Sequence, residues 1–168
     1  MNYLMNEEEI LERYEINEET LALLPNNKKE TIVIEKNRSF KVKEDATQIM
    51  KFSCEYFGSS LSGRQRGTTS LIGVTHKVPV IVEESREIIF FPTNSPRLKN
   101  CGWLSFNNIK NYKKDANGEG TIVEFKTGKS INIDLSYGSL DNQILRAAKL
   151  NLMLKDRKDF LPNNKSNK

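Results

Sequence analysis

Short apolar stretches separated by turn-forming residues run along most of the chain, which is the pattern of strands joined by turns. Ile32-Val33-Ile34 is β-branched throughout, as strands favour. Residues 121–126 and 130–135 flank Thr127-Gly128, and this arrangement predicts a hairpin. The other predicted strands cover residues 14–16, 20–25, 31–36, 39–42, 71–75, 80–83, 88–91, 101–105 and 108–113.

Two segments carry apolar residues at helical spacing instead. The first covers residues 46–57, with Asp45 as the expected N-cap and Gly58 as the expected C-cap. The second covers residues 140–158 and is expected to begin after Ser139 as its N-cap. One internal helix and one C-terminal helix among many strands predict an α+β fold with a mainly antiparallel, curved sheet.

The last third of the chain, from Trp103 onward, is a predicted meander of strands followed by one helix. This order resembles the end of bacterial pleckstrin-homology-like domains, and the resemblance implies a partly closed barrel without implying a function. We expect Trp103 to close the core of this region rather than to contact a ligand, because large aromatic side chains dominate cores.

The length of 168 residues and the apolar share of 37% fit one globular domain. We assign residues 14–160 to that domain, residues 1–13 to an acidic N-terminal segment and residues 161–168 to a disordered polar tail. The N-terminus lacks the apolar region of a signal peptide, and no apolar run is long enough to span a membrane. We therefore expect a cytoplasmic protein with no membrane partner.

The net charge of +4 is unevenly distributed. Residues 1–35 hold nine acidic residues against three basic ones, whereas residues 36–168 hold 23 basic residues against 13 acidic ones. A basic body behind an acidic N-terminal segment favours a polyanion as the partner of the body.

The stretch of residues 54–79 contains four of the nine glycines and the single histidine, His76. We predict a glycine-spaced loop there that extends Arg64 and Arg66 among serine and threonine hydroxyls, which is a set of groups suited to phosphate. The alternative is a mobile, solvated surface loop. A second polar loop, residues 93–100, carries Arg97 and Lys99.

No motif for catalysis or for a cofactor is complete. Gly58 and Gly63 have the spacing of a P-loop, but Arg64-Gln65 stands where lysine and a hydroxyl residue are required. His76 is followed by Lys77, and a nearby cation disfavours the imidazolium that a general base must become. Cys54 and Cys101 form no C-x-x-C pair, so we expect two reduced, buried thiols, with a disulfide as the minor alternative and a zinc site disfavoured. We predict neither an enzyme nor a cofactor.

Several short motifs resemble the ComK family of competence transcription factors from Gram-positive bacteria, and together they span residues 14–158. In chain order they are Phe57-Gly-Ser-Ser60, Gly63-Arg64, Gly67-Thr68, His76-Lys77, Pro79, Phe91-Pro-Thr93, Cys101-Gly-Trp103, Ser136-Tyr137, Asn142-Gln143 and Arg146.

The resemblance implies an activator that binds paired A/T-rich boxes mainly through the minor groove and bends the DNA. It also implies dimers that pair into tetramers on promoters of DNA-uptake genes, RNA polymerase as a partner, and control by an adaptor and a Clp-type protease. Well-known members continue past the last helix with an aromatic-bearing tail used in regulated degradation. This sequence ends in a polar tail at Lys168, so an adaptor would have to bind another surface.

Arginine is the side chain best suited to the narrow, negative minor groove of an A-tract, which agrees with the implied function. The seven residues that we expect to contact DNA come from the two cationic loops: Arg64, Arg66, His76, Lys77, Arg97, Lys99 and Asn100. If the protein reads the major groove instead, the basic helix face around Arg146 and Lys149 is the first candidate. The alternative function is a protein- or lipid-binding module with a pleckstrin-homology-like fold.

Overall fold

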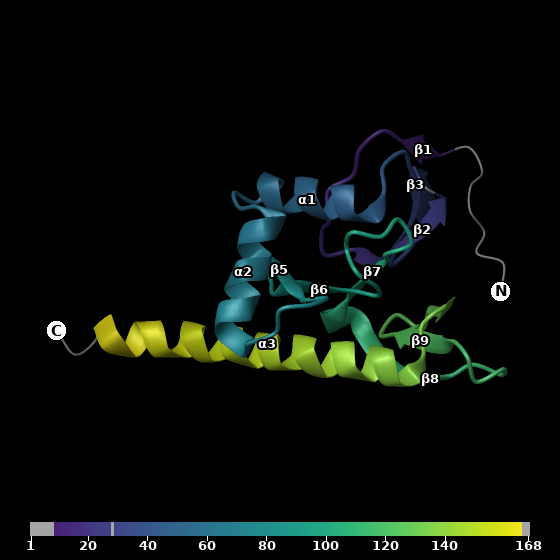
Figure 1. The fold of residues 1–168 in the computed structure, drawn as a ribbon. Helices are drawn as coiled ribbons and strands as arrows, with labels where there is room; N and C mark the ends of the chain where they lie inside the picture. The colour runs from purple at the N-terminus through teal and green to yellow at the C-terminus, as the bar shows by residue number, and fades with distance from the viewer. Residues whose placement is uncertain (1–8, 28, 166–168) are drawn as a thin grey trace.

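The computed structural model describes residues 9–27 and 29–165 (Figure 1). The helices within this part of the chain are α1 (Ala46–Tyr56), α2 (Leu61–Ile72) and α3 (Tyr137–Lys165), with a short 3-10 helix at Phe106–Asn108. The strands are β1 (Ile10–Leu11), β2 (Thr20–Asn27), β3 (Glu30–Glu35), β4 (Ser39–Val42), β5 (Val80–Glu83), β6 (Ile88–Pro92), β7 (Trp103–Ser105), β8 (Ile109–Lys114), β9 (Thr121–Phe125) and β10 (Ser130–Ile133).

The described strands form two open sheets and no closed barrel. The larger sheet has the order β1-β4-β3-β2-β7-β6-β5, and the smaller has the order β10-β9-β8. Every pairing is antiparallel except that of β1 with β4. The predicted α+β class and mainly antiparallel pairing are therefore confirmed, whereas the partly closed barrel is not what these strands build.

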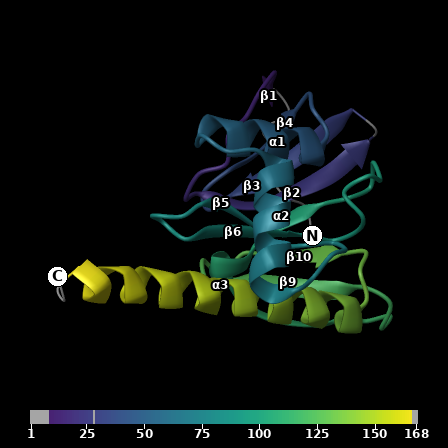
Figure 2. The ribbon, with the colours of Figure 1, turned by 60° about the vertical axis from the view of Figure 1, so that its left-hand side comes forward.

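Both faces of the larger sheet are buried. Successive side chains of a strand point to opposite faces, so neighbouring residues enter different cores. Leu23 and Trp103 lie in a core that also contains Ile49 and Met50 of α1. Their neighbours Ala22 and Leu104 lie in a second core, shared with the smaller sheet and with α3. Figure 2 shows α2 running across the sheet from α1 to α3, so that this helix connects the two layers.

Trp103 is fully buried, which confirms its predicted place in the core. Its indole Nε1 donates a hydrogen bond to Thr47 Oγ1 at 3.3 Å, so the one polar atom of the side chain has a partner. The predicted meander and terminal helix are present as β8, β9, β10 and α3. The likeness of this third to pleckstrin-homology-like domains stays a prediction.

The ends of α3 differ from the sequence-based prediction. The helix begins at Tyr137, and Ser136 is the residue whose hydroxyl accepts a hydrogen bond from the Ser139 N–H at 3.3 Å. Ser139 therefore lies inside the first turn rather than at the cap. The helix continues to Lys165, past its predicted end at residue 158 and into the segment predicted to be a disordered tail, and residues 166–168 lie outside the described residues.

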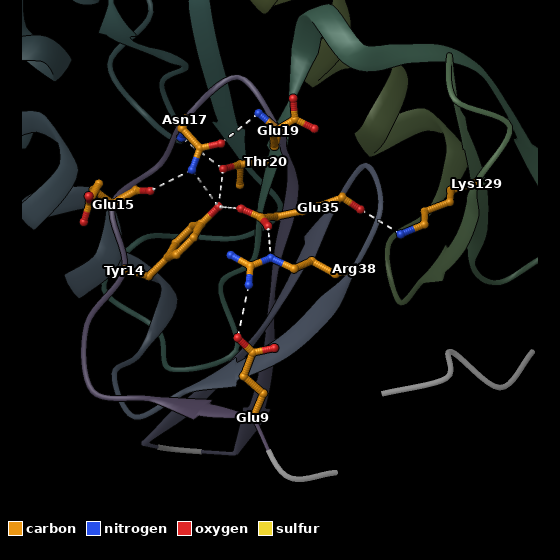
Figure 3. A network of polar contacts seen from close by, with 9 residues as sticks. All are labelled: Glu9, Tyr14, Glu15, Asn17, Glu19, Thr20, Glu35, Arg38 and Lys129. Atoms are coloured by element: carbon orange, nitrogen blue, oxygen red, sulfur yellow. Dashed lines mark hydrogen bonds and ion pairs between the residues drawn. The ribbon is translucent and has the colours of Figure 1, made fainter. Parts of the chain in front are cut away.

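Residues 14–16 were predicted as a strand but form an irregular segment held by a buried polar network (Figure 3). The Tyr14 hydroxyl donates to Glu35 Oε2 at 2.6 Å, and burial together with this bond raises the pKa of Tyr14. Arg38 Nε binds the other oxygen of Glu35 at 2.6 Å, and Lys129 Nζ donates to the Glu35 carbonyl at 2.7 Å. Since Lys129 lies in the β9–β10 turn, the network joins the two sheets.

The described part of the predicted acidic segment is tied to the body by ion pairs. Glu9 binds Arg38 at 3.1 Å, and Glu12 binds Lys43 at 3.1 Å. Residues 10–11 form β1 beside β4. Residues 1–8 lie outside the described residues.

Candidate nucleic-acid interface

A surface groove of about 600 Å³ lies where α1, α2 and two loops meet. We call it the basic groove. One wall is the polar face of α2, and the others are Thr47 and Lys51 of α1, residues 75–78 after α2 and residues 95–97 after β6. Four of the seven predicted DNA contacts line it: Arg66, His76, Lys77 and Arg97.

The glycine-spaced loop that we predicted around Arg64 and Arg66 is wrong, because residues 61–72 form helix α2. Ser60 is the N-cap, and its hydroxyl accepts from the Gly63 N–H at 3.0 Å. Gly73 ends the helix in the left-handed conformation, with φ of 73°, a value that glycine reaches without strain. The predicted strand over residues 71–75 is wrong for the same reason.

The helix separates two arginines that a loop would have allowed to act together. Residues two apart on a helix point to nearly opposite faces, and so only Arg66 lines the basic groove. Arg64 faces the β5–β6 turn, where its Nη1 binds Glu84 Oε1 at 3.1 Å and its side chain is 22% exposed. Arg64 is therefore engaged in an intramolecular ion pair on the other side of α2.

The loop that carries His76 and Lys77 is fixed by hydrogen bonds from both sides. From α2, Thr69 Oγ1 donates to the Val74 carbonyl at 2.7 Å, and Thr68 Oγ1 donates to the Pro79 carbonyl at 2.6 Å. Lys77 itself has φ of 49°, which a non-glycine residue adopts only when its surroundings hold it.

Helix α3 holds the same loop from the side opposite α2. The buried Gln143 donates through Nε2 to the Lys77 carbonyl at 2.9 Å, and Arg146 Nη1 donates to the His76 carbonyl at 2.9 Å. The side chains of His76 and Lys77 remain exposed on this fixed backbone. The loop therefore holds a cation and an imidazole in place without flexible glycines.

The cationic residues of the second loop, residues 93–100, lie in different surroundings. Arg97 is exposed and lines the basic groove, whereas Lys99 Nζ binds Asp45 at the N-cap of α1 at 2.9 Å. Although partial burial opposes ionisation, hydrogen bonds from Lys99 and from the Gln48 N–H hold the pKa of Asp45 below its usual value. Asn100 lies apart from the groove, in a hollow lined also by Asn94 and Asp134.

A smaller hollow of about 200 Å³ continues the basic groove toward α3. It shares His76 and Lys77 with the groove and adds Asn142, Gln143 and Arg146. The predicted alternative site around Arg146 therefore adjoins the groove instead of forming a separate surface. Lys149 lines neither hollow.

The charge of the groove is one-sided. Lys51, Arg66, Lys77 and Arg97 line it, and no aspartate or glutamate of the described chain does. None of these four cations forms an ion pair with another described residue. Cations that converge without ion-pair partners create a positive potential that attracts polyanions, and the hydroxyl of Ser62 and the amide of Gln65 add donors beside them.

Sequence reasoning missed Lys51 and the polar face of α2. Lys51 was placed on a helix correctly, but only the tertiary fold brings it beside loops that lie about 25 and 45 residues further along the chain. The helical nature of α2 had a visible signal in Ser60 as a cap, with apolar or buried positions at Leu61, Thr68 and Ile72 on one stripe.

The two cysteines of the described chain are not activated thiols. Cys54 and Cys101 are free and buried, and burial raises the pKa of each thiol to about 11, so both are un-ionised near neutral pH. No group of three His, Cys, Asp or Glu within the described residues could hold a metal ion. None of the described helices is both long enough and apolar enough to cross a membrane.

Comparison with known proteins gives two matches. The family model described as "ComK protein" matches residues 11–159. The chain is also 39% identical over 152 residues to the competence transcription factor of Bacillus subtilis (strain 168), with 89% of this chain and 79% of that protein covered. No solved structure matches the chain.

Proposed function

The chain belongs to the ComK family, and we propose that this competence transcription factor binds A/T-rich promoter DNA through the basic groove. Its B. subtilis relative carries the name of the same regulatory class. Transcription factors are not enzymes, which agrees with the expectation of no catalytic site. The observation that carries the proposal is the convergence of Lys51, Arg66, Lys77 and Arg97 on a groove that no described acidic residue lines.

The groove is suited to a duplex because its cations come from separate, fixed elements. Arg66 lies on α2, Lys77 on the loop clamped by α3, and Arg97 on the loop after β6. Contacts to phosphates on both sides of a duplex groove fix the register of a protein on DNA, and a central arginine can then sense groove width. We propose that Arg66 and Arg97 reach the minor groove, with Lys51 and Lys77 on flanking phosphates.

The wider properties that the family resemblance implies are also proposals for this chain. They are paired boxes, dimers and tetramers on DNA, recruitment of RNA polymerase, and control by an adaptor and a Clp-type protease. Arg64 and Lys99 remain candidate DNA contacts only if their present partners are exchanged on binding, and Asn100 remains one only if the DNA extends beyond the basic groove. The Arg64–Glu84 and Lys99–Asp45 ion pairs argue against this, since an existing pair must be broken first.

The test is a fluorescence-anisotropy titration of the full chain with a labelled A/T-rich duplex and a G·C-rich duplex of equal length. A third duplex replaces A·T pairs by I·C pairs, which keep the minor-groove acceptors and rewrite the major-groove edge. We expect the A/T and I·C duplexes to bind and the G·C duplex to bind weakly. Equal affinity for all three would contradict sequence-selective binding, and binding of the A/T duplex alone would place the contacts in the major groove.

A further inference from the structure

The loop after β6, residues 94–100, is held by several polar contacts although it lies on the surface. We call it the Pro96 loop. The Pro96 carbonyl accepts from Thr47 Oγ1 at 3.3 Å, and Asn94 Nδ2 donates to the Asn100 carbonyl at 3.2 Å. Together with the Lys99–Asp45 pair at 2.9 Å, these contacts fasten the loop to the start of α1 and close its own base.

Leu98 lies at the junction of two turns within this loop. Its N–H donates to the Ser95 carbonyl at 3.0 Å, and its carbonyl accepts from the Cys101 N–H at 3.2 Å. The backbone of Leu98 is thus held on both sides, while the residue is 54% exposed. Its neighbours in sequence are Arg97, which lines the basic groove, and Lys99.

A leucine held in this way has a specific use on DNA. Proteins that bind the minor groove insert apolar side chains between neighbouring base pairs, and this unstacks the step and kinks the duplex. Such a wedge needs an exposed apolar tip, a backbone that does not yield, and cations beside it to hold the phosphates. The Pro96 loop supplies Leu98, the pinned turns and Arg97.

We propose that Leu98 is an intercalating wedge that enters a base step next to the basic groove and bends the bound DNA. This inference rests on the proposed function, since it needs a duplex in the groove. Other exposed large apolar residues of the described chain, such as Leu145 and Leu152 on α3, do not lie on a groove-lining loop. They carry no comparable argument.

A wedge also gives the protein a sequence preference at the base step that it enters, although no hydrogen bond contacts the bases there. Pyrimidine–purine steps such as TA unstack easily, whereas AA steps inside an A-tract are stiff. We therefore expect Leu98 to favour a TA step at its point of entry. Because both steps contain only A·T pairs, the preference is separate from recognition of A/T content.

The experiment uses the full chain and a set of A/T-rich duplexes with 2-aminopurine placed at successive steps, together with end labels for energy transfer. We expect the wild type to raise 2-aminopurine fluorescence at one step and to shorten the end-to-end distance. Leu98→Ala should abolish the fluorescence rise and lower the bend angle by roughly half or more, given kinks of about 20–90° for such wedges. Leu98→Met should retain both signals, because methionine also serves as a wedge.

The matched control is Leu145→Ala, which removes a leucine that is 60% exposed on α3 and should leave both signals unchanged. A Leu98→Ala protein that bends and unstacks the duplex like the wild type would overturn the wedge. A wild type that binds A/T-rich DNA without bending it would overturn the wedge and leave the proposed function intact. A wild type that binds no A/T-rich duplex would overturn both.

Discussion

Gly67 offers a direct test of helix α2, the element that sequence reasoning took for a loop. It lies in the interior of the helix, and a Cβ added there would meet no atom within 4 Å. Glycine is about 0.8–1.0 kcal/mol less favourable than alanine inside a helix. Because no clash offsets this gain, we expect Gly67→Ala to stabilise the protein by nearly that amount.

For a chain of 168 residues, a gain of about 1 kcal/mol corresponds to a rise in Tm of roughly 2–4 °C. Thermal unfolding followed by circular dichroism, together with urea unfolding, measures the change. DNA affinity should stay unchanged, because Gly67 lines a hollow on the Arg64 side of α2 rather than the basic groove. A flexible loop that needs its glycines would instead lose affinity and gain no stability.

Gly73→Ala is the matched control, because the same substitution should have the opposite sign there. Gly73 has φ of 73°, and a left-handed residue with a Cβ is strained by about 1–2 kcal/mol. If Gly67→Ala destabilises the protein as much as Gly73→Ala does, residues 61–72 do not behave as a helix in solution. The account of the groove would then lose its central wall.

Two further predictions concern stability. Trp103→Ala should lower the free energy of unfolding by about 3–5 kcal/mol, because it empties a fully buried site and leaves Thr47 without its indole partner; a urea unfolding curve close to that of the wild type would show that the site collapses around the gap. Asp45→Ala should cost about 1 kcal/mol at neutral pH through loss of the N-cap. The pKa of Asp45 is lowered in the folded protein, so its stabilisation is present above the unfolded pKa of about 3.9 and is lost as the pH falls through the folded pKa. Unfolding curves of wild type and variant should thus converge in acid, and a constant difference down to the lowest pH would refute the linkage.

Much of the fold could be read from the sequence because local and global signals agree there. The strand at Ser39–Val42 and the cap at Asp45 follow from alternation and capping rules that tertiary packing does not oppose. Residues 61–72 were mistaken for a loop because Gly63 and Gly67 have low helix propensity. The burial of Leu61 and Ile72 against the rest of the protein outweighs that propensity. Residues 14–16 were mistaken for a strand because Tyr14 and Ile16 are buried in the core like strand residues, although the Ile16 N–H binds the Ser53 hydroxyl instead of a neighbouring strand.

The candidate site was predictable only as a list of cations. Arg66, His76, Lys77 and Arg97 were chosen from charge and loop composition, and the fold brings them to one groove. Which cations are already neutralised depends on long-range pairs such as Arg64 with Glu84, and no local sequence rule gives these. The hydrogen bonds that hold both loops also come from distant residues, including Gln143 and Thr47.

The proposed groove is tested most directly by the salt dependence of A/T-rich DNA binding in two charge-matched variants. Arg66→Ala/Arg97→Ala removes two cations from the groove, and Lys113→Ala/Lys114→Ala removes two exposed cations from β8 that line neither groove nor hollow. A cation bound in the negative minor groove also releases counterions from the phosphates, so each cation lost flattens the plot of log affinity against log salt by up to about 0.9. We predict that the groove variant binds more weakly with a visibly flatter slope, while the β8 variant matches the wild type. Equal losses in both variants, or a groove variant that binds like the wild type, would contradict the account.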